Sequence, residues 1–390
     1  MSVTAPKGFR ASGVSAGMKA SGRPDLALLV ADRPVAAAGL FTTNAFPAAP
    51  VTLSQRHLLG GRAAAIVVNS GQANAATGEQ GLEDASATAD AVARAIGVRP
   101  AEVLVCSTGV IGPRVKLDAL LGGLPRAVGA LDARGGTGFA EAILTTDTAA
   151  KRTLVQAGGF TVGACAKGAG MIAPDLATLL AFFTTDAAVE PAVLDAAMRR
   201  AALPVWNGVT VDACTSTNDA VLALASGASG VRADPGSAAL AALEEALATA
   251  SRDLARQVVL DAEGATKALV VHVGGAVSDA DARRVAAAVA SSPLVKTMLL
   301  GADPNAGRLL QAVGASGVPV DPARARIRLA GKTVVAGGRM VAFDERACAE
   351  AMKEREVAVV VDLGIGDGEA TAFGCDLGYD YVRINAEYTT

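Results

Sequence analysis

The sequence predicts an α/β fold in which helices alternate with strands and the strands form mixed sheets. Short apolar runs that end in polar, glycine-containing turns are typical of strands, and longer stretches with apolar residues every three or four positions are typical of helices. The chain of 390 residues is 51% hydrophobic but only 3% aromatic. Its cores must therefore be built from Ala, Val, Leu and Ile, and its length predicts two or three domains.

In the first half of the chain, residues 64–68 and 103–105 are predicted strands. Residues 81–97 lie between them and carry apolar residues at helical spacing. Acids lie early in this stretch and Arg94 lies late, which suits the dipole of a helix. Residues 128–138 are rich in glycine, and we expect them to form a surface loop or linker.

The second half of the chain continues the alternation. Residues 190–203 begin with a proline near a predicted first turn and repeat apolar residues at helical spacing. A long alanine-rich helix is predicted at residues 238–261, a strand at 268–273 and a further helix at 280–290. Residues 325–383 are mostly strand-like. A mild change of composition at residues 274–279 predicts a boundary before a smaller C-terminal subdomain.

Charge and targeting signals exclude several classes of protein. The 35 basic and 38 acidic residues give a net charge of -3 without a basic cluster, which argues against a nucleic-acid partner. The first residues lack the apolar region of a secretory signal, and no apolar run approaches the roughly 20 residues that span a membrane. Five scattered cysteines and two isolated histidines lack the spacing of a metal site. We expect a cytoplasmic protein with no metal and no membrane partner.

Residues 167–186, KGAGMIAPDLATLLAFFTTD, contain the strongest functional signal. A threonine in apolar surroundings has no obvious base, but it gains one if the chain is cut before it. A cut between Ala177 and Thr178 would place an α-amino group, with a pKa of about 7.7–8.0, on the residue that carries the hydroxyl. Such a threonine is a recognised activated nucleophile. Taken alone, the Ala–Thr pair is more typical of a buried strand or helix with an incidental threonine.

Several further segments match a family pattern together with this stretch. They are STGVIG at 107–112, TTDT at 145–148, DAEGATK at 261–267 and YVRINAEYTT at 381–390. The chain resembles the ornithine acetyltransferase family, the bifunctional glutamate N-acetyltransferases and amino-acid N-acetyltransferases of arginine biosynthesis. The resemblance spans about residues 8–390 and implies layered mixed sheets flanked by helices, of αββα type. The chain departs from the family pattern at two places: Ala306 stands where the family usually has Trp, and DACTSTND at 212–219 replaces the commoner DGDTSTND.

The resemblance also implies roles for individual residues. Thr108 and Gly109 would form the oxyanion hole around the nucleophile Thr178, and the substrate would contact that threonine together with Thr145, Lys167, Glu263, Asn385 and Thr390. Read singly, each motif has an ordinary structural explanation. STG suits a glycine turn, TTDT a capped end of a helix or strand, the lysine a solvated surface charge, and the glutamate a loop carboxylate.

The implied activity is acetyl transfer by a self-cleaved enzyme. Attack of Thr178 on Ala177 would give an α chain, residues 1–177, which carries the oxyanion hole. The β chain would comprise a catalytic part at 178–275 and a subdomain at 276–390 whose tail returns to the site. N2-acetyl-L-ornithine would acetylate Thr178 and release L-ornithine. L-glutamate would then accept the acetyl group and leave as N-acetyl-L-glutamate. No cofactor is implied, because the protein carries the acetyl group. The resemblance further implies an α2β2 heterotetramer.

Other functions remain compatible with the sequence. The protein could accept acetyl-CoA as a second donor, or be a paralogue that acts in a secondary pathway. The same threonine could serve an amidohydrolase or aminopeptidase, which would release free acetate or an amino acid. A non-catalytic small-molecule-binding protein would retain an intact chain. The state of the bond between residues 177 and 178 separates this last alternative from the others.

Overall fold

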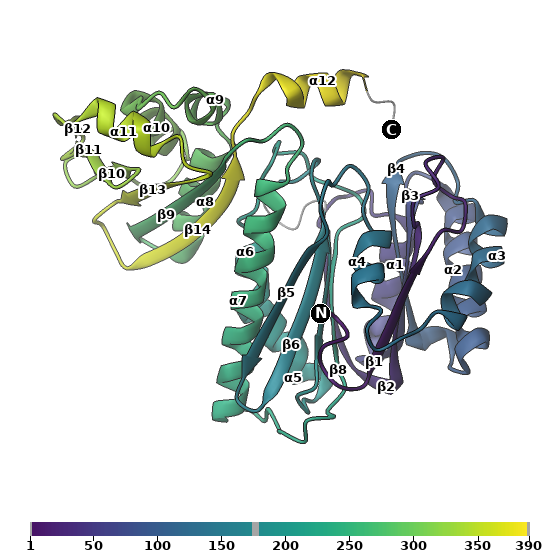
Figure 1. Cartoon of the computed structure of the whole chain (residues 1–390). Helices are drawn as coiled ribbons and strands as arrows, with labels where there is room; N and C mark the ends of the chain where they lie inside the picture. Colours follow the sequence, from purple (N-terminus) through teal and green to yellow (C-terminus); the bar gives the residue numbers. More distant parts are fainter. Residues whose placement is uncertain (1, 174–178, 388–390) are drawn as a thin grey trace.

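Two mixed β-sheets organise the protein, for which a computed structural model describes residues 2–173 and 179–387 (Figure 1). Within those residues the first sheet has eight strands in the order β4-β3-β2-β8-β7-β6-β5, with β1 paired to β2. Its strands are β1 (Phe9–Val14), β2 (Leu26–Phe41), β3 (Arg62–Gln72), β4 (Val103–Val110), β5 (Lys151–Ala157), β6 (Phe160–Lys167), β7 (Leu180–Thr185) and β8 (Ala220–Ala225).

The long strand β2 folds this sheet into two facing layers. Residues 26–30 of β2 pair with β3, residues 36–41 pair with β8, and the register shifts between Val30 and Val35. The two layers bury a common core that includes Ile66, Phe139 and Phe182. Successive side chains of a strand point to opposite faces, and Phe183 accordingly joins a second core on the other side of β7.

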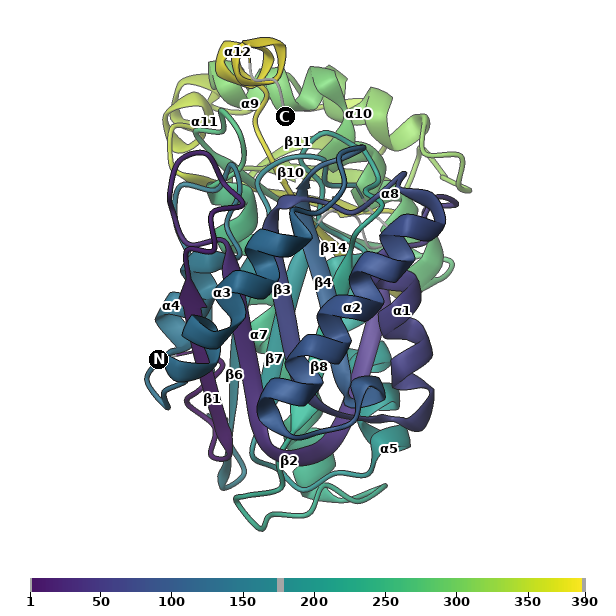
Figure 2. The ribbon, with the colours of Figure 1, turned by 90° about the vertical axis from the view of Figure 1, so that its right-hand side faces the viewer.

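Helices cover both outer faces, which completes an αββα arrangement (Figure 2). The helices α2 and α3 pack on the face formed by β2, β3 and β4, and α5, α6 and α7 pack on the face formed by β5 to β8. The layered α/β fold expected from the sequence is therefore confirmed. The helices of this unit are α1 (Ala49–His57), α2 (Gly78–Ile96), α3 (Leu117–Gly129), α4 (Gly136–Ala142), α5 (Pro191–Ala197), α6 (Leu203–Trp206) and α7 (Ala238–Leu260), with a π-helical turn at Met198–Ala202.

The second sheet forms the C-terminal unit and has the order β12-β11-β10-β13-β9-β14. Its first strand in sequence, β9, begins at Ala268, so this unit starts ahead of the glycine-rich boundary expected at 274–279. The elements of this unit are β9 (Ala268–Ala276), β10 (Arg326–Leu329), β11 (Lys332–Ala336), β12 (Arg339–Met340), β13 (Glu356–Asp362), β14 (Gly368–Cys375), α8 (Asp279–Ser291), α9 (Pro293–Gly301), α10 (Ala306–Gly314) and α11 (Glu345–Ala351). The terminal helix α12 (Tyr379–Glu387) leaves this unit and extends toward the first one (Figure 1).

Two sequence expectations need correction. The region 325–383 contains the helix α11, which the Asp344 side chain caps by accepting a hydrogen bond from the backbone N–H of Ala347, and the beginning of α12. Residues 128–138 are not a simple surface loop, because α3 extends to Gly129 and α4 begins at Gly136. The glycines there serve close packing, since a Cβ at Gly135 would lie 1.8 Å from the carbonyl oxygen of Ala11. Ala306, at the position of the family Trp, is fully buried in the core of the second unit.

None of the helices that the structure describes is long and apolar enough to cross a membrane.

Candidate active site

A cavity of about 640 Å³ brings together the site residues predicted from separate parts of the sequence. Its lining includes Thr108, Gly109, Thr145, Lys167, Glu263 and Asn385, which lie up to 277 positions apart. The segment that leads to the expected cut also reaches this cavity, because Gly170 and Met171 line it. The expected cut between Ala177 and Thr178, and the predicted substrate contact at Thr390, lie outside the described residues.

Gly109 adopts a conformation that only glycine accommodates easily. It lies at the end of β4, paired in parallel register with Gly71 of β3, and has a φ of 123°. A Cβ at this position would lie 2.4 Å from the carbonyl carbon of Gly71. The two glycines let the strand ends approach closely, and they leave the backbone at 108–109 open to the cavity.

The hydroxyl of Thr108 is oriented by a buried lysine. The Lys167 Nζ donates to Thr108 Oγ1 at 3.2 Å, and both side chains are largely buried. A lysine ammonium can only donate, so the threonine oxygen must accept this bond. The hydrogen of the Thr108 hydroxyl therefore remains available to an acceptor in the cavity, as an oxyanion donor requires.

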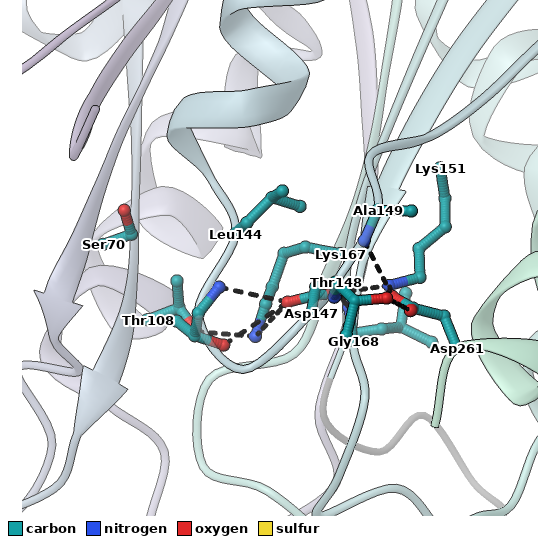
Figure 3. Close-up of polar contacts among 12 residues, drawn as sticks. Ser70, Thr108, Leu144, Asp147, Thr148, Ala149, Lys151, Lys167, Gly168 and Asp261 are labelled. Carbon is teal, nitrogen blue, oxygen red and sulfur yellow. Dashed lines mark hydrogen bonds and ion pairs between the residues drawn. The ribbon is translucent and has the colours of Figure 1, made fainter. Parts of the chain in front are cut away.

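Asp147 links the predicted substrate-contacting residues to one another (Figure 3). Its buried carboxylate accepts hydrogen bonds from the backbone N–H groups of Gly168, at 2.7 Å, and Thr145, at 3.1 Å. It also accepts a bond of 2.6 Å from Lys151 Nζ, and Lys167 Nζ lies 4.0 Å away. The carboxylate thus ties the end of β6 to the TTDT segment and supplies negative charge to two buried ammonium groups.

Burial and charge act in opposite directions on this group. Desolvation raises the pKa of the Asp147 carboxyl, but the charges of Lys167 and Lys151, with the hydrogen bonds from Lys151 and Gly168, hold that pKa well below its usual range. Burial lowers the pKa of Lys167 below its usual range, and the charge of Asp147 opposes this lowering. The Asp147 carboxylate thus stabilises the positive charge of the lysine beside Thr108 against the cost of burial.

Lys151 is in turn shared with Asp261 at the C-terminal end of α7. Its Nζ donates to the Asp261 carboxylate, which also accepts from the Thr148 hydroxyl and, at 3.1 Å, from the Thr148 backbone N–H (Figure 3). Sequence reasoning assigned no role to Asp147, Lys151 or Asp261. The first and last lie inside quoted motifs, which was the available signal, whereas nothing in the sequence pattern marked Lys151.

Glu263 and the terminal helix form another part of the cavity wall. The Glu263 backbone N–H donates to the carbonyl of Ala169 at 2.8 Å, and Asn385 Nδ2 donates to Glu263 Oε2 at 2.9 Å. The carboxylate lies against Gly170, where a Cβ would approach Glu263 Oε2 to 2.5 Å. Glu263 and Asn385 are thus joined to each other and to the chain just before the expected cut.

Two aspartates anchor the backbone on either side of residues 174–178. Asp212 accepts hydrogen bonds from the N–H groups of Met171, at 2.7 Å, and Ile172, at 2.9 Å. Asp219 accepts one from Leu179 at 2.8 Å. Asp212 also accepts a bond of 3.2 Å from the hydroxyl of Tyr381 in α12. The DACTSTND segment, predicted to be mainly structural, therefore fixes both ends of the stretch that contains the expected cut.

Comparison with known proteins agrees with these motifs. The profile of the ArgJ family matches residues 10–390. The chain belongs to the ArgJ family. The arginine biosynthesis bifunctional protein ArgJ of Symbiobacterium thermophilum is 48% identical over 395 residues, which cover 100% of this chain and 98% of the relative. The protein of the same name from Gloeobacter violaceus is 49% identical over 397 residues, with the same coverage of both chains.

A solved structure is similar to part of this ArgJ-family chain. It is the arginine biosynthesis bifunctional protein of Bacillus halodurans, with 40% identity and a TM-score of 0.52 over 53% of this chain and 98% of the solved chain. The family assignment makes the present chain an acetyltransferase of arginine biosynthesis.

No group of three or more His, Cys, Asp or Glu side chains within residues 2–173 and 179–387 is arranged to hold a metal ion.

Proposed function

We propose that this ArgJ-family enzyme cleaves itself before Thr178 and then moves an acetyl group from N2-acetyl-L-ornithine to L-glutamate through an acetyl-threonine. The observation that carries the proposal is the convergence of six separately predicted residues on one cavity, next to the chain that leads into residues 174–178. The Bacillus halodurans chain is about half as long as this one, which fits one product of a cut near the middle.

Self-cleavage begins with attack of Thr178 Oγ on the carbonyl carbon of Ala177. The Ala177–Thr178 amide bond breaks as the acyl group moves to the hydroxyl oxygen, and the threonine nitrogen takes up the proton as a free amine. Water then hydrolyses the ester, which gives residues 1–177 with a new carboxylate and residues 178–390 with an N-terminal threonine.

Acetyl transfer uses the same hydroxyl twice. The Thr178 amine accepts the hydroxyl proton while Oγ attacks the acetyl carbon of the donor, and it returns the proton to the ornithine nitrogen as that amide bond breaks. The amine of glutamate then attacks the acetyl-threonine ester and regenerates the hydroxyl. The Thr108 hydroxyl, held by Lys167, and the Gly109 N–H stabilise the oxyanion of both tetrahedral intermediates. The enzyme needs no cofactor for these steps.

Mass spectrometry of the purified protein tests the cleavage. We expect two fragments that meet between residues 177 and 178, and Thr178→Ala should leave one intact chain without acetyl transfer. Thr178→Ser, which keeps a hydroxyl, is the matched control and should still be cut. An intact wild-type chain with full transferase activity would refute the mechanism.

Kinetics with purified protein test the transfer. A covalent acetyl-enzyme predicts ping-pong kinetics and acetylation of the β chain by N2-acetyl-L-ornithine alone. A requirement for a ternary complex would contradict it. Free acetate formed faster than N-acetyl-L-glutamate would favour the hydrolase alternative. Glutamate acetylation from acetyl-CoA without acetylornithine would establish the second activity. Native mass determination tests the proposed α2β2 assembly.

A further inference from the structure

In the proposed reaction, one cavity must bind two substrates whose side chains carry opposite charges. The donor carries the ornithine ammonium, whereas the acceptor carries a side-chain carboxylate. Among the described residues that line the cavity, Glu263 is the single acid, and Lys19, Arg23, Lys116 and Lys167 are basic. Lys167 already serves Thr108 and Asp147. Three cations therefore remain without a role in a protein whose net charge is negative.

Lys19 is held in place by a loop built around a buried carboxylate. The fully buried Asp25 accepts hydrogen bonds from the backbone N–H groups of Ala16, Met18 and Lys19, at 2.6 to 2.9 Å. This arrangement fixes the connection between β1 and β2 and directs Lys19 to the cavity. The position of the lysine is thus set by the fold, unlike that of a surface lysine.

The Lys19 ammonium lies beside the predicted substrate-contacting threonine and keeps one donor for a ligand. Its Nζ donates to the carbonyl of Pro24 at 2.8 Å and to that of Leu144 at 2.7 Å. Leu144 directly precedes Thr145, which also lines the cavity. An ammonium has three hydrogens, so two bonds to carbonyl groups leave one for an acceptor in the cavity.

Lys116 and Arg23 add positive charge at the exposed rim of the same region. Lys116 Nζ donates to the carbonyl of Met18 at 3.0 Å, which brings it to the loop that carries Lys19. Arg23 lies exposed on that loop and lines the same cavity. Both side chains can therefore turn toward an anion that enters the cavity.

The charges around Lys19 favour a negative ligand. The pKa of Lys19 is lowered to about 8, mainly by burial; the charges of Arg23 and Lys167 contribute to this lowering, whereas those of Asp25 and Asp147 oppose it. Cations that destabilise one another are stabilised by a shared anion. Glu263 belongs to a different part of the wall, beside Gly170 and Asn385, where it suits a cationic side chain.

We propose that Lys19, with Lys116 and Arg23 at the rim, binds the side-chain carboxylate of the acceptor glutamate, whereas Glu263 receives the ammonium of the donor side chain. The inference rests on the proposed function. It explains how one nucleophile can serve two amino acids of similar length and opposite charge, since each side chain has its own end of a shared cavity.

The test compares glutamate with glutamine as acceptor, because glutamine has nearly the same shape and lacks the charge. Enzyme acetylated with N2-acetyl-L-ornithine would be mixed with either acceptor, using wild type, Lys19→Met, Lys19→Arg and Lys116→Met. The matched control is Lys353→Met, because this exposed lysine pairs with Glu350 and does not line the cavity. We expect Lys19→Met to reduce the preference for glutamate over glutamine roughly tenfold to a hundredfold, as for loss of a charged hydrogen bond. Lys19→Arg should restore most of that preference, and Lys353→Met should not change it.

Other outcomes would overturn the inference. Equal losses with glutamate, glutamine and acetylornithine would show that the lysine binds the α-carboxylate shared by all three. A loss confined to reactions driven by acetyl-CoA would assign the basic group to phosphate. If Lys19→Met does not fold, an unchanged preference in Lys116→Met is the refuting result. Failure of the wild-type enzyme to release ornithine or to become acetylated would instead refute the proposed function.

Discussion

Asp147 supplies the negative charge for two buried lysines, and replacing it by asparagine tests how the site is held together. The carboxylate has no exposed surface, bonds Lys151 Nζ at 2.6 Å and lies 4.0 Å from Lys167 Nζ. Asparagine keeps nearly the same shape but removes the charge. Lys151 retains Asp261, so the unfavourable consequence falls mainly on Lys167.

The expected loss of unfolding free energy follows from this unequal effect on the two lysines. Removing one partner of a buried ion pair typically costs about 3–5 kcal/mol, because the other charge is left buried. We expect Asp147→Asn to lower the free energy of unfolding by about 3 kcal/mol, the lower end of that range, since Asp261 still serves Lys151. The matched control is Asp261→Asn. The Asp261 side chain is 13% exposed and Asp147 remains in place, so this variant should lose about 1–2 kcal/mol of unfolding free energy.

Urea unfolding followed by the fluorescence of Trp206 measures both variants. This single tryptophan is fully buried in the core beneath α7 and reports the unit that carries the site. The folded-state pKa of Asp147 is depressed, so its contribution is present above the unfolded value near 3.8 and is lost as the pH falls below that value. The difference between wild type and Asp147→Asn should therefore shrink in acid. A loss below about 1 kcal/mol at pH 7, or a difference that grows toward low pH, would refute the reasoning.

Three further predictions concern individual positions in the cavity. Thr108→Ala should lower kcat about a hundredfold or more with a smaller change in KM, because it removes an oxyanion donor, and Thr108→Ser should retain most of the rate in steady-state assays. An unchanged kcat in Thr108→Ala would exclude the hydroxyl from the oxyanion hole. Gly109→Ala should destabilise the protein by several kcal/mol in thermal unfolding. The added Cβ would lie 2.4 Å from the carbonyl carbon of Gly71, and the backbone there has a φ of 123°. A melting temperature equal to that of wild type would contradict this account. The KM for glutamate should rise above about pH 8, where Lys19 loses its charge, and Lys19→Arg should remove that rise. A KM that stays flat through pH 9 in the wild type would argue against an acceptor carboxylate at Lys19.

The sequence predicted much of the fold because its signals there are local. Helices such as α2 and α7 were expected nearly at their observed limits, since apolar spacing along a helix records the face that it buries. The layered α/β class followed from the alternation of such segments and from the family resemblance. The helix α11 was missed because it is short and lies among strands. The glycines at 135–136 resembled a flexible loop, and only their neighbours show that they allow close packing.

The sequence by itself determined which segments carry the proposed chemistry, since a family pattern names residues without locating them. Tertiary structure decided which groups act on one another. Asp147 meets Lys167, and Lys151 meets Asp261 across 110 positions, because the start of β5, the end of β6 and the C-terminal end of α7 lie together. The proposed role of Lys19 depends on its loop, which reaches the cavity only in the folded chain. The strength of an interaction between charges depends on their distance and burial, and neither quantity is written in the order of the residues.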